Sequence, residues 1–587
     1  MFATFWKQVL FLTLCALLQK GYGSLECEVT TKPNIIFILV DDLGWNDVSF
    51  HGSQQIPTPN IDALARDGVI LNQYYVQPMC TPSRAALMTG KYPIKTGLQH
   101  FVLWAESPYG LPLNETILPQ YLKQLGYATH AIGKWHLGFF QNEYLPVNRG
   151  FDSHFGFWSG KEDYFTHWQQ SKLFSGLDLH NNFDDEWGYN GTYGTDLFTM
   201  KAVDIIENHN ASQPLFLYLA HQAVHVANKY EPLQAPAYYF DKFSHIEDLD
   251  RRVFAGMMSA LDDSIGELFS ALDRAKILNN TIIIFSTDNG GEVEGGNHGT
   301  GSNYPLRGSK ENLWEGGVRG VAFVWSQFLR KVKNVSEELM HITDWLPTLY
   351  SLAGGDPSAL KDIDGINQWP SICSGESTKR KEILLNIDPE WNVEGIRRGK
   401  YKLIKGTVRN GIYDGWYDLE GKKRDNKYFT DEELNIYQQV YKDAALNSAV
   451  QDILFMNYGQ EYAVKFCSSS STSNLQEDEA DCISCFEYYD DFEEFLGMCA
   501  CPVTVDCGSR PQNKGVECNP NVAACLFNTD DDPCEYNNLA TSEPKIVEEL
   551  EAALNFYRSE AVPIINKPDD LASNPANRGY AWGPWKS

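Results

Sequence analysis

The segment Asn34-Ile35-Ile36-Phe37-Ile38-Leu39-Val40, followed by Asp41-Asp42, decides the fold that this sequence predicts. The run is almost entirely apolar and rich in β-branched residues, which is typical of a central strand covered on both faces. Two carboxylates at the end of a buried strand are costly unless a positive charge meets them. A bound calcium or magnesium ion would do so, because these ions prefer oxygen ligands; a solvated turn is the alternative.

A second segment repeats this arrangement. Thr281–Thr287 predicts another buried strand, and Asp288-Asn289 follow directly at its end. Two such strand ends in one sheet would bring four oxygen ligands near one point. That convergence favours a metal site over two unrelated turns.

Two further predicted strands end in basic side chains. Ala128–Gly133 runs into Lys134 and His136, which point to the same face if the backbone stays extended. Pro214–Ala220 leads to His225. A single histidine is most often structural, but a lysine and a histidine on one face at a strand end favour a functional site.

Strands and helices alternate along the first two thirds of the chain. This order predicts an α/β layered domain, in which ligands bind beyond the carboxyl ends of the strands. A basic loop around Lys310 either contributes to that site or is simply solvated. The predicted helices are Thr58–Asp67, Leu118–Leu125, Asp196–Asn208, Asp248–Ala275 and Ile342–Leu352.

The run Cys80-Thr81-Pro82-Ser83-Arg84 predicts the start of another helix, which Gly90 ends. Thr81 suits the capping position and Pro82 the first helical position, which places Cys80 just outside the helix. Free backbone N–H groups there attract an anion, and Arg84 in the first turn adds a charge suited to an oxyanion. For a lone cysteine the alternative is a buried or disulfide-bonded residue.

Composition and the amino terminus indicate a compartment. A chain of 587 residues is long enough for at least two domains, and its formal net charge of −29 excludes nucleic acid as a partner. Residues 1–23 resemble a signal peptide whose apolar run is too short to span a bilayer, and no later stretch predicts a transmembrane segment. We therefore expect the secretory pathway, with the protein either secreted or lysosomal. Five glycosylation sequons fit this route and start at Asn114, Asn190, Asn210, Asn279 and Asn334.

The 13 cysteines concentrate near the carboxyl end. Eight lie between Cys467 and Cys525, and Cys534 follows closely, which predicts a local disulfide framework in an oxidising compartment. Once the signal peptide and Cys80 are set aside, an odd number remains. One cysteine is therefore expected to be unpaired or joined to another chain, and the two isolated cysteines, Cys27 and Cys373, are the candidates.

The order Cys80-x-Pro82-x-Arg84 resembles the signature of the sulfatase family, whose cysteine is oxidised to formylglycine in the endoplasmic reticulum. The strings around Asp41, Lys134, Asp288 and Lys310 also resemble that family, and within it the branch of arylsulfatase B, an N-acetylgalactosamine-4-sulfatase. The similarity covers residues 33 to about 390 and resumes near 525–587. The sequence departs from that branch in a cysteine-rich stretch from about 420 to 525 and in a short insertion at 226–230.

The resemblance implies a fold and a domain division. We expect an alkaline-phosphatase-like sulfatase fold, with a large mixed sheet flanked by helices. A smaller carboxyl-terminal α+β domain would carry a small antiparallel sheet. The expected divisions are a signal peptide at 1–23, a catalytic domain at 24–390, and a second domain at 391–587 with the cysteine-rich insertion.

The resemblance also implies a site and its chemistry. One calcium ion would be bound by Asp41, Asp42, Asp288, Asn289 and the formylglycine made from Cys80. The aldehyde hydrate would attack sulfur, His225 or Lys310 would protonate the leaving alcohol, and His136 would act as base in releasing sulfate. The residues expected to complete the catalytic pocket are Arg84, Lys134, His136, His225 and Lys310, of which Lys134, His225 and Lys310 would hold the sulfate oxygens.

The implied activity is sulfate-ester hydrolysis, and the expected partner during biosynthesis is the formylglycine-generating enzyme. The substrate stays open between N-acetylgalactosamine 4-sulfate groups of glycosaminoglycans and small aryl or dietary plant sulfates. A phosphoester hydrolase on a similar scaffold is less favoured, because that class uses serine or threonine as nucleophile. A non-catalytic binder of sulfated glycans is the alternative if Cys80 stays a thiol.

Overall fold

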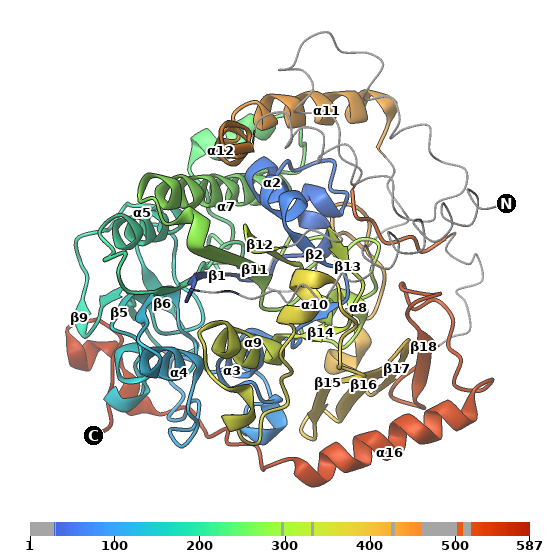
Figure 1. Cartoon of the computed structure of the whole chain (residues 1–587). Helices are drawn as coiled ribbons and strands as arrows, with labels where there is room; N and C mark the ends of the chain where they lie inside the picture. Colours follow the sequence, from blue (N-terminus) through green and yellow to red (C-terminus); the bar gives the residue numbers. More distant parts are fainter. Residues whose placement is uncertain are drawn as a thin grey trace, which may run out of the picture.

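The computed structural model describes residues 29, 31–294, 299–329, 334–423, 429–458, 502–508 and 518–587. Its centre is a mixed sheet of ten strands (Figure 1). In spatial order these are β13 (Val335–Ser336), β2 (Val69–Leu71), β12 (Ala322–Ser326), β11 (Thr281–Thr287), β1 (Asn34–Val40), β10 (Leu215–Ala220), β4 (Ala128–Lys134), β5 (Ser153–Phe157), β8 (His180–Asn181) and β9 (Asp184–Asp185).

Five neighbouring strands at the centre run parallel: β11, β1, β10, β4 and β5. The carboxyl ends of β11, β1 and β10 are aligned, because Val40 pairs with Thr287 and Leu39 pairs with Ala220. The residues that follow these strands therefore emerge at one edge of the sheet. The predicted strands are confirmed, and so is their convergence.

Helices cover both faces of the sheet (Figure 1). β1 shows why: Ile36, Ile38 and Val40 belong to one buried core, while the intervening residues of the strand belong to the other. On the first face lie α2 (Pro59–Asp67), α5 (Gly194–Glu207) and α7 (Leu249–Arg274), and on the second lie α3 (Cys80–Thr89), α4 (Leu118–Gln124) and α9 (Trp345–Leu352).

A smaller antiparallel sheet follows, as predicted, with β15 (Glu382–Asp388), β16 (Val393–Arg398), β17 (Tyr401–Lys405) and β18 (Cys525–Asn528) in that order. Helix α16 (Pro544–Glu560) packs on it through Leu550 and Leu554. The small sheet contacts the main body at a buried cluster of charges. There the Lys402 ammonium lies 2.8 Å from carboxylate oxygens of Glu315 and Glu535. The domain boundary near residue 390 stays a prediction.

The cysteine prediction is wrong in one respect. Cys373 takes part in a disulfide, so it is not an unpaired thiol; its isolation in the sequence says nothing about its neighbours in space. Disulfides join Cys507 to Cys534 and Cys518 to Cys525. Cys27, the signal peptide and most of the cysteine-rich insertion lie outside the described residues.

The sequons lie at the surface, as expected, but the exposure of their asparagine side chains differs. Asn114, Asn190, Asn210 and Asn279 are exposed, whereas Asn334 is half-buried and its amide donates to the backbone oxygen of Arg66, 3.2 Å away. Glycosylation at all five stays a prediction. Within the described ranges, no helix combines the length and the hydropathy needed to cross a bilayer.

We expect two buried histidines to make the fold sensitive to acid. Burial lowers the pKa of His154 and of His221 to about 3. An unfolded histidine takes up a proton below pH about 6.5, whereas these two stay neutral in the folded protein, so stability falls as pH decreases from 6.5 towards 3. Each should cost about 2 kcal/mol of unfolding free energy between pH 7 and pH 5.

Urea unfolding at the two pH values measures this cost. His221→Gln should lose about 2 kcal/mol less than the parent protein on acidification. His209→Gln, at an accessible position, is the matched control and should follow the parent. An equal loss in all three proteins would contradict the assignment.

Candidate active site

The carboxyl ends of β1 and β11 bring the four predicted metal ligands together. Asp41, Asp42, Asp288 and Asn289 are all buried. The Asn289 amide donates to Asp42 Oδ1 at 2.7 Å, and the Asp42 backbone N–H lies 3.4 Å from Asp288 Oδ1. Asp42 has a φ of 60°, which ends the extended strand directly after Asp41. This break allows two consecutive carboxylates to face one space, which a continuing strand would not.

Cys80 lies beside these carboxylates at the start of α3, and its Sγ is 3.3 Å from Asp41 Oδ1. The predicted helix start is wrong by a small shift: Cys80 is the first helical residue and Met79 is the cap. Thr81 does not cap, because its hydroxyl donates to the backbone oxygen of His136 at 3.2 Å. Gly90 ends the helix as predicted, with a φ of 67°.

Arg84 extends from the first turn of α3 and holds Asp288. Its Nη2 and Nε lie 2.8 and 3.0 Å from Asp288 Oδ2, and Nη2 is 3.7 Å from Asp41 Oδ1. Burial alone would raise the pKa of Asp288, but the charges of Arg84 and Lys134 lower it. Asp288 is therefore an anion fixed in position by a buried guanidinium.

Two lysines balance the carboxylates of β1. Lys134, at the end of β4, donates to Asp41 Oδ2, and Lys310 donates to Asp42 Oδ2 at 2.7 Å. Burial and the neighbouring Asp288 raise the pKa of Asp41 to about 7 despite Lys134. Burial alone would lower the pKa of Lys310, but Asp42 together with Cys80, Glu292 and Asp41 outweighs burial, and the pKa is raised. Both predicted sulfate-binding lysines thus lie at the centre of the cluster.

The two predicted histidines also lie here, in different settings. His225 Nε2 is 3.7 Å from Asp42 Oδ2, while its Nδ1 lies 2.6 Å from the backbone oxygen of Val226. His136 Nε2 is 2.9 Å from the backbone oxygen of Leu103, and its Nδ1 is buried without a partner. Burial, reinforced by nearby lysines, lowers the pKa of both histidines, so both rings are neutral in this arrangement.

The donor set fits a divalent cation. Ligand atoms of Asp41, Asp42, Cys80 and His225 lie within 4.8 Å of one another. Asn289 Oδ1 is buried and has no hydrogen-bond partner, which is costly unless something else satisfies it. Carboxylate and amide oxygens are the ligands that hard cations prefer. This buried group can therefore hold a metal ion, and the structure adds His225 to the residues that surround it.

Lys161 is a residue of this region that the sequence analysis missed. It follows β5, and its ammonium lies close enough to Glu292, Lys310 and Asp42 to interact with their charges. Its neighbour Gly160 lies against His136: a Cβ there would be 2.8 Å from His136 Nε2. The signal was present but unused, because Lys161 is one more basic residue shortly after a central strand.

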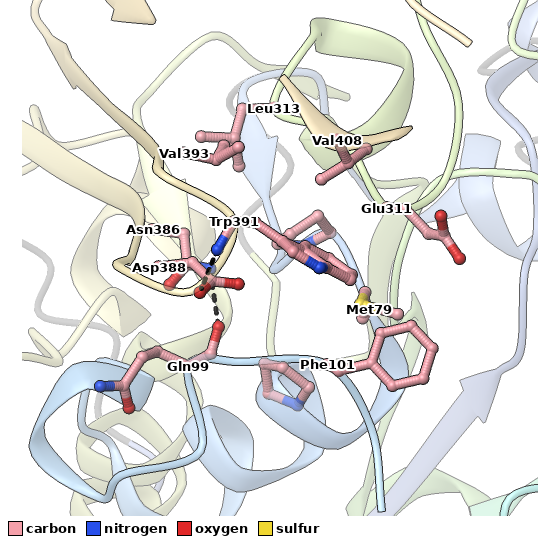
Figure 2. Close-up of a pocket in the computed structure, with 12 residues that line it drawn as sticks. Met79, Gln99, Phe101, Glu311, Leu313, Asn386, Asp388, Trp391, Val393 and Val408 are labelled. Carbon is pink, nitrogen blue, oxygen red and sulfur yellow. Dashed lines mark hydrogen bonds between the residues drawn. The ribbon is translucent and has the colours of Figure 1, made fainter. Parts of the chain in front are cut away.

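A narrow cavity of about 10 Å³ lies next to the start of α3 (Figure 2). Met79 and Phe101 line it from the main body, and Trp391 comes from the turn between β15 and β16. The rings of Phe101 and Trp391 pack edge to face with centroids 5.4 Å apart. The smaller sheet thus contributes an aromatic side chain beside the residue that precedes Cys80.

Comparison with known proteins agrees with this geometry. The family model described as Sulfatase matches residues 33–355. Arylsulfatase J of Mus musculus is 38% identical over 575 residues, which cover 96% of this chain and 83% of that protein. N-acetylgalactosamine-6-sulfatase of Mus musculus is 33% identical over 390 residues, covering 64% of this chain and 71% of that protein.

A solved structure, Ps i-CgsB in complex with k-i-k-neocarrahexaose, superposes with a TM-score of 0.58 and 29% identity, covering 75% of this chain and 98% of that chain. The alkaline-phosphatase-like fold is thereby confirmed, with its large mixed sheet and separate antiparallel sheet. The family model spans more than half of the chain, and the relatives and the superposed fold point the same way. This protein belongs to the sulfatase family and is a sulfatase.

Proposed function

We propose that this sulfatase cleaves sulfate monoesters with a formylglycine made from Cys80 and one calcium ion held by Asp41, Asp42, Asp288 and Asn289. One observation carries the proposal. The Cys80 side chain is free, buried and 3.3 Å from Asp41 Oδ1, at the centre of a set of oxygen donors. A cysteine kept for packing alone would not need four carboxylate and amide side chains around it.

The chemistry at residue 80 depends on the groups that surround it. A hydrated aldehyde would supply one hydroxyl for attack on sulfur and a second for release of sulfate, and a bound calcium ion would supply positive charge beside them. Arg84, fixed by Asp288, places its guanidinium next to that position. Lys134 and Lys310 provide two ammonium groups for the sulfate oxygens, over which negative charge spreads in the transition state.

The two histidines suit opposite proton transfers. His136 is neutral with an unpartnered Nδ1, so it can accept a proton from residue 80. His225 presents Nε2 to the carboxylate cluster while its Nδ1–H is held by a backbone oxygen, so Nε2 would donate a proton to the leaving alcohol only after the ring has taken one up. Lys310 is the alternative donor.

The substrate class is proposed on the relatives and on two partly exposed aromatic rings near the start of α3, Phe101 and Trp391. N-acetylgalactosamine-6-sulfatase, by its name, acts on a sulfated amino sugar, and rings such as Phe101 and Trp391 suit contact with a sugar face. We favour sulfated amino sugars of glycosaminoglycans, with the 4-sulfate expected for an arylsulfatase B-like enzyme. Small aryl or plant sulfates are the second candidate, supported by the similarity to arylsulfatase J.

The route through the cell belongs to the same proposal. Formylglycine would be made by the formylglycine-generating enzyme after entry through a signal peptide at residues 1–23. The mature protein would then be secreted or lysosomal. A catalytic domain at 24–390 and a smaller domain at 391–587 remain the proposed division.

One experiment tests the proposal directly. The protein is expressed in a eukaryotic secretory host, and the mass of the peptide that contains residue 80 is measured. We expect the mass of the aldehyde, together with release of sulfate from aryl sulfate or N-acetylgalactosamine 4-sulfate. An intact thiol combined with no sulfate release would overturn the proposal and leave a non-catalytic glycan binder.

A further inference from the structure

Among the described residues, Lys161 differs from the other lysines of the site in that no carboxylate lies within ion-pair distance of its ammonium; Glu292 and Asp42 act on it only at longer range. Lys134 is paired with Asp41 and Lys310 with Asp42. Across the described part of the chain, no ion pair or hydrogen bond joins the Lys161 ammonium to another group. Its charge is therefore available to a ligand, whereas the other two ammonium groups already balance carboxylates.

The backbone around Lys161 is held in place. The Ser159 N–H donates to Asp178 Oδ2 at 3.0 Å, and the Ser159 hydroxyl donates to the backbone oxygen of Lys161 at 3.1 Å. On the other side, Glu162 and Gln222 exchange two hydrogen bonds of 2.7 Å. A cation on such a fixed loop loses little freedom when it binds an anion.

The Lys161 side chain is more exposed to solvent than those of Lys134 and Lys310. Lys134 and Lys310 are 1% and 7% exposed, whereas Lys161 is only partly buried. It still interacts electrostatically with His225, Lys310 and Asp42, so it lies at the edge of the same site. A group that reaches Lys161 would thus belong to the part of the substrate outside the sulfate being cleaved.

We propose that Lys161 binds a second anionic group of the substrate, a carboxylate or another sulfate, carried by the same sugar or its neighbour. This inference rests on the proposed sulfatase activity and extends it to the substrate. Lys161 makes the enzyme selective for polyanionic glycans over small sulfate esters that carry a single charge. In a protein with a net charge of −29, a cation beside the site that has no ion pair with any described residue also attracts such a substrate locally.

The test compares three substrates: N-acetylgalactosamine 4-sulfate, the same sugar linked to glucuronic acid, and that disaccharide with its carboxylate methyl-esterified. A disulfated sugar forms a fourth arm that separates sulfate from carboxylate recognition. The parent protein should show a kcat/KM about tenfold higher for the substrates with a second charge, as expected for one charge-assisted contact. Lys161→Met should remove that advantage through KM, with less than about a twofold change for the singly charged substrates.

Two variants serve as controls. Lys161→Arg should keep most of the preference, and Lys276→Met, which removes the same charge at an exposed position, should keep all of it. Equal losses on all substrates would place Lys161 on the cleaved sulfate, and no change on any would leave it without a role; either result overturns the inference. If the parent protein releases no sulfate from any substrate, the sulfatase proposal itself fails.

Discussion

Replacement of Cys80 by serine is expected to limit the protein to at most one sulfate released per molecule, and Cys80→Ala is expected to release none. A serine offers one hydroxyl to sulfur but lacks the second hydroxyl of an aldehyde hydrate, so it would be trapped as its sulfate ester. Alanine offers no nucleophile. The surrounding Asp41, Arg84 and Lys134 contacts remain in both variants.

Quenched-flow measurement of sulfate per enzyme molecule distinguishes the outcomes. The serine variant should show, at most, a single stoichiometric burst and a peptide carrying the added mass of sulfate. The parent protein, with the same metal content and unfolding midpoint, should turn over continuously. Steady hydrolysis by the alanine variant would show that residue 80 is not the nucleophile, and steady hydrolysis by the serine variant would show that the aldehyde hydrate is not required; either result would refute the assignment.

The sequence predicted the position of the site because polar residues follow the buried strands directly. Burial of the strands and their parallel pairing explain why these residues converge. A run such as Ile35 to Val40 has no stable place except in a sheet covered on both faces. Parallel neighbours then bring Asp41 and Asp288 to one edge without any side-chain information. The register that aligns the ends of these strands is a property of the backbone, so the convergence of the four side chains could be predicted before their contacts were seen.

The misses have physical causes too. The start of α3 shifted because the Thr81 hydroxyl found a partner in the backbone of His136, a contact across 55 residues that local capping rules do not include. The role of Cys373 depended on a disulfide partner that spacing does not reveal. The position of Lys161 after a central strand was a signal that the sequence analysis did not use, but only the packed structure shows that Lys134 and Lys310 are paired whereas Lys161 has no ion pair among the described residues.

Removal of calcium should abolish activity and lower stability. A variant of Asn289 tests whether the change in stability depends on this one ligand. The ion-free protein should remain folded, because Lys134 and Lys310 already neutralise Asp41 and Asp42. Calcium at about 100 times its dissociation constant should raise the unfolding free energy by about 2.7 kcal/mol. Asn289→Ala deletes the buried, unpartnered Oδ1 and should remove much of this gain.

Asn386→Ala is the matched control, since Asn386 is also buried with an unpartnered Oδ1 but lies in β15, where it lines the cavity beside the start of α3 and is not part of the carboxylate cluster. It should lower stability equally with and without calcium, because the hydrogen bond that the Asn386 side-chain amide donates to the backbone oxygen of Gln99 is lost in both states. Thermal unfolding with chelator or with added calcium therefore separates a general packing defect from loss of a ligand. If calcium shifted the midpoints of Asn289→Ala and the parent protein equally, Asn289 would not be a ligand. If calcium shifted neither, the carboxylate cluster would be stabilised by its lysines alone, and the proposed chemistry would lack the positive charge that it requires beside residue 80.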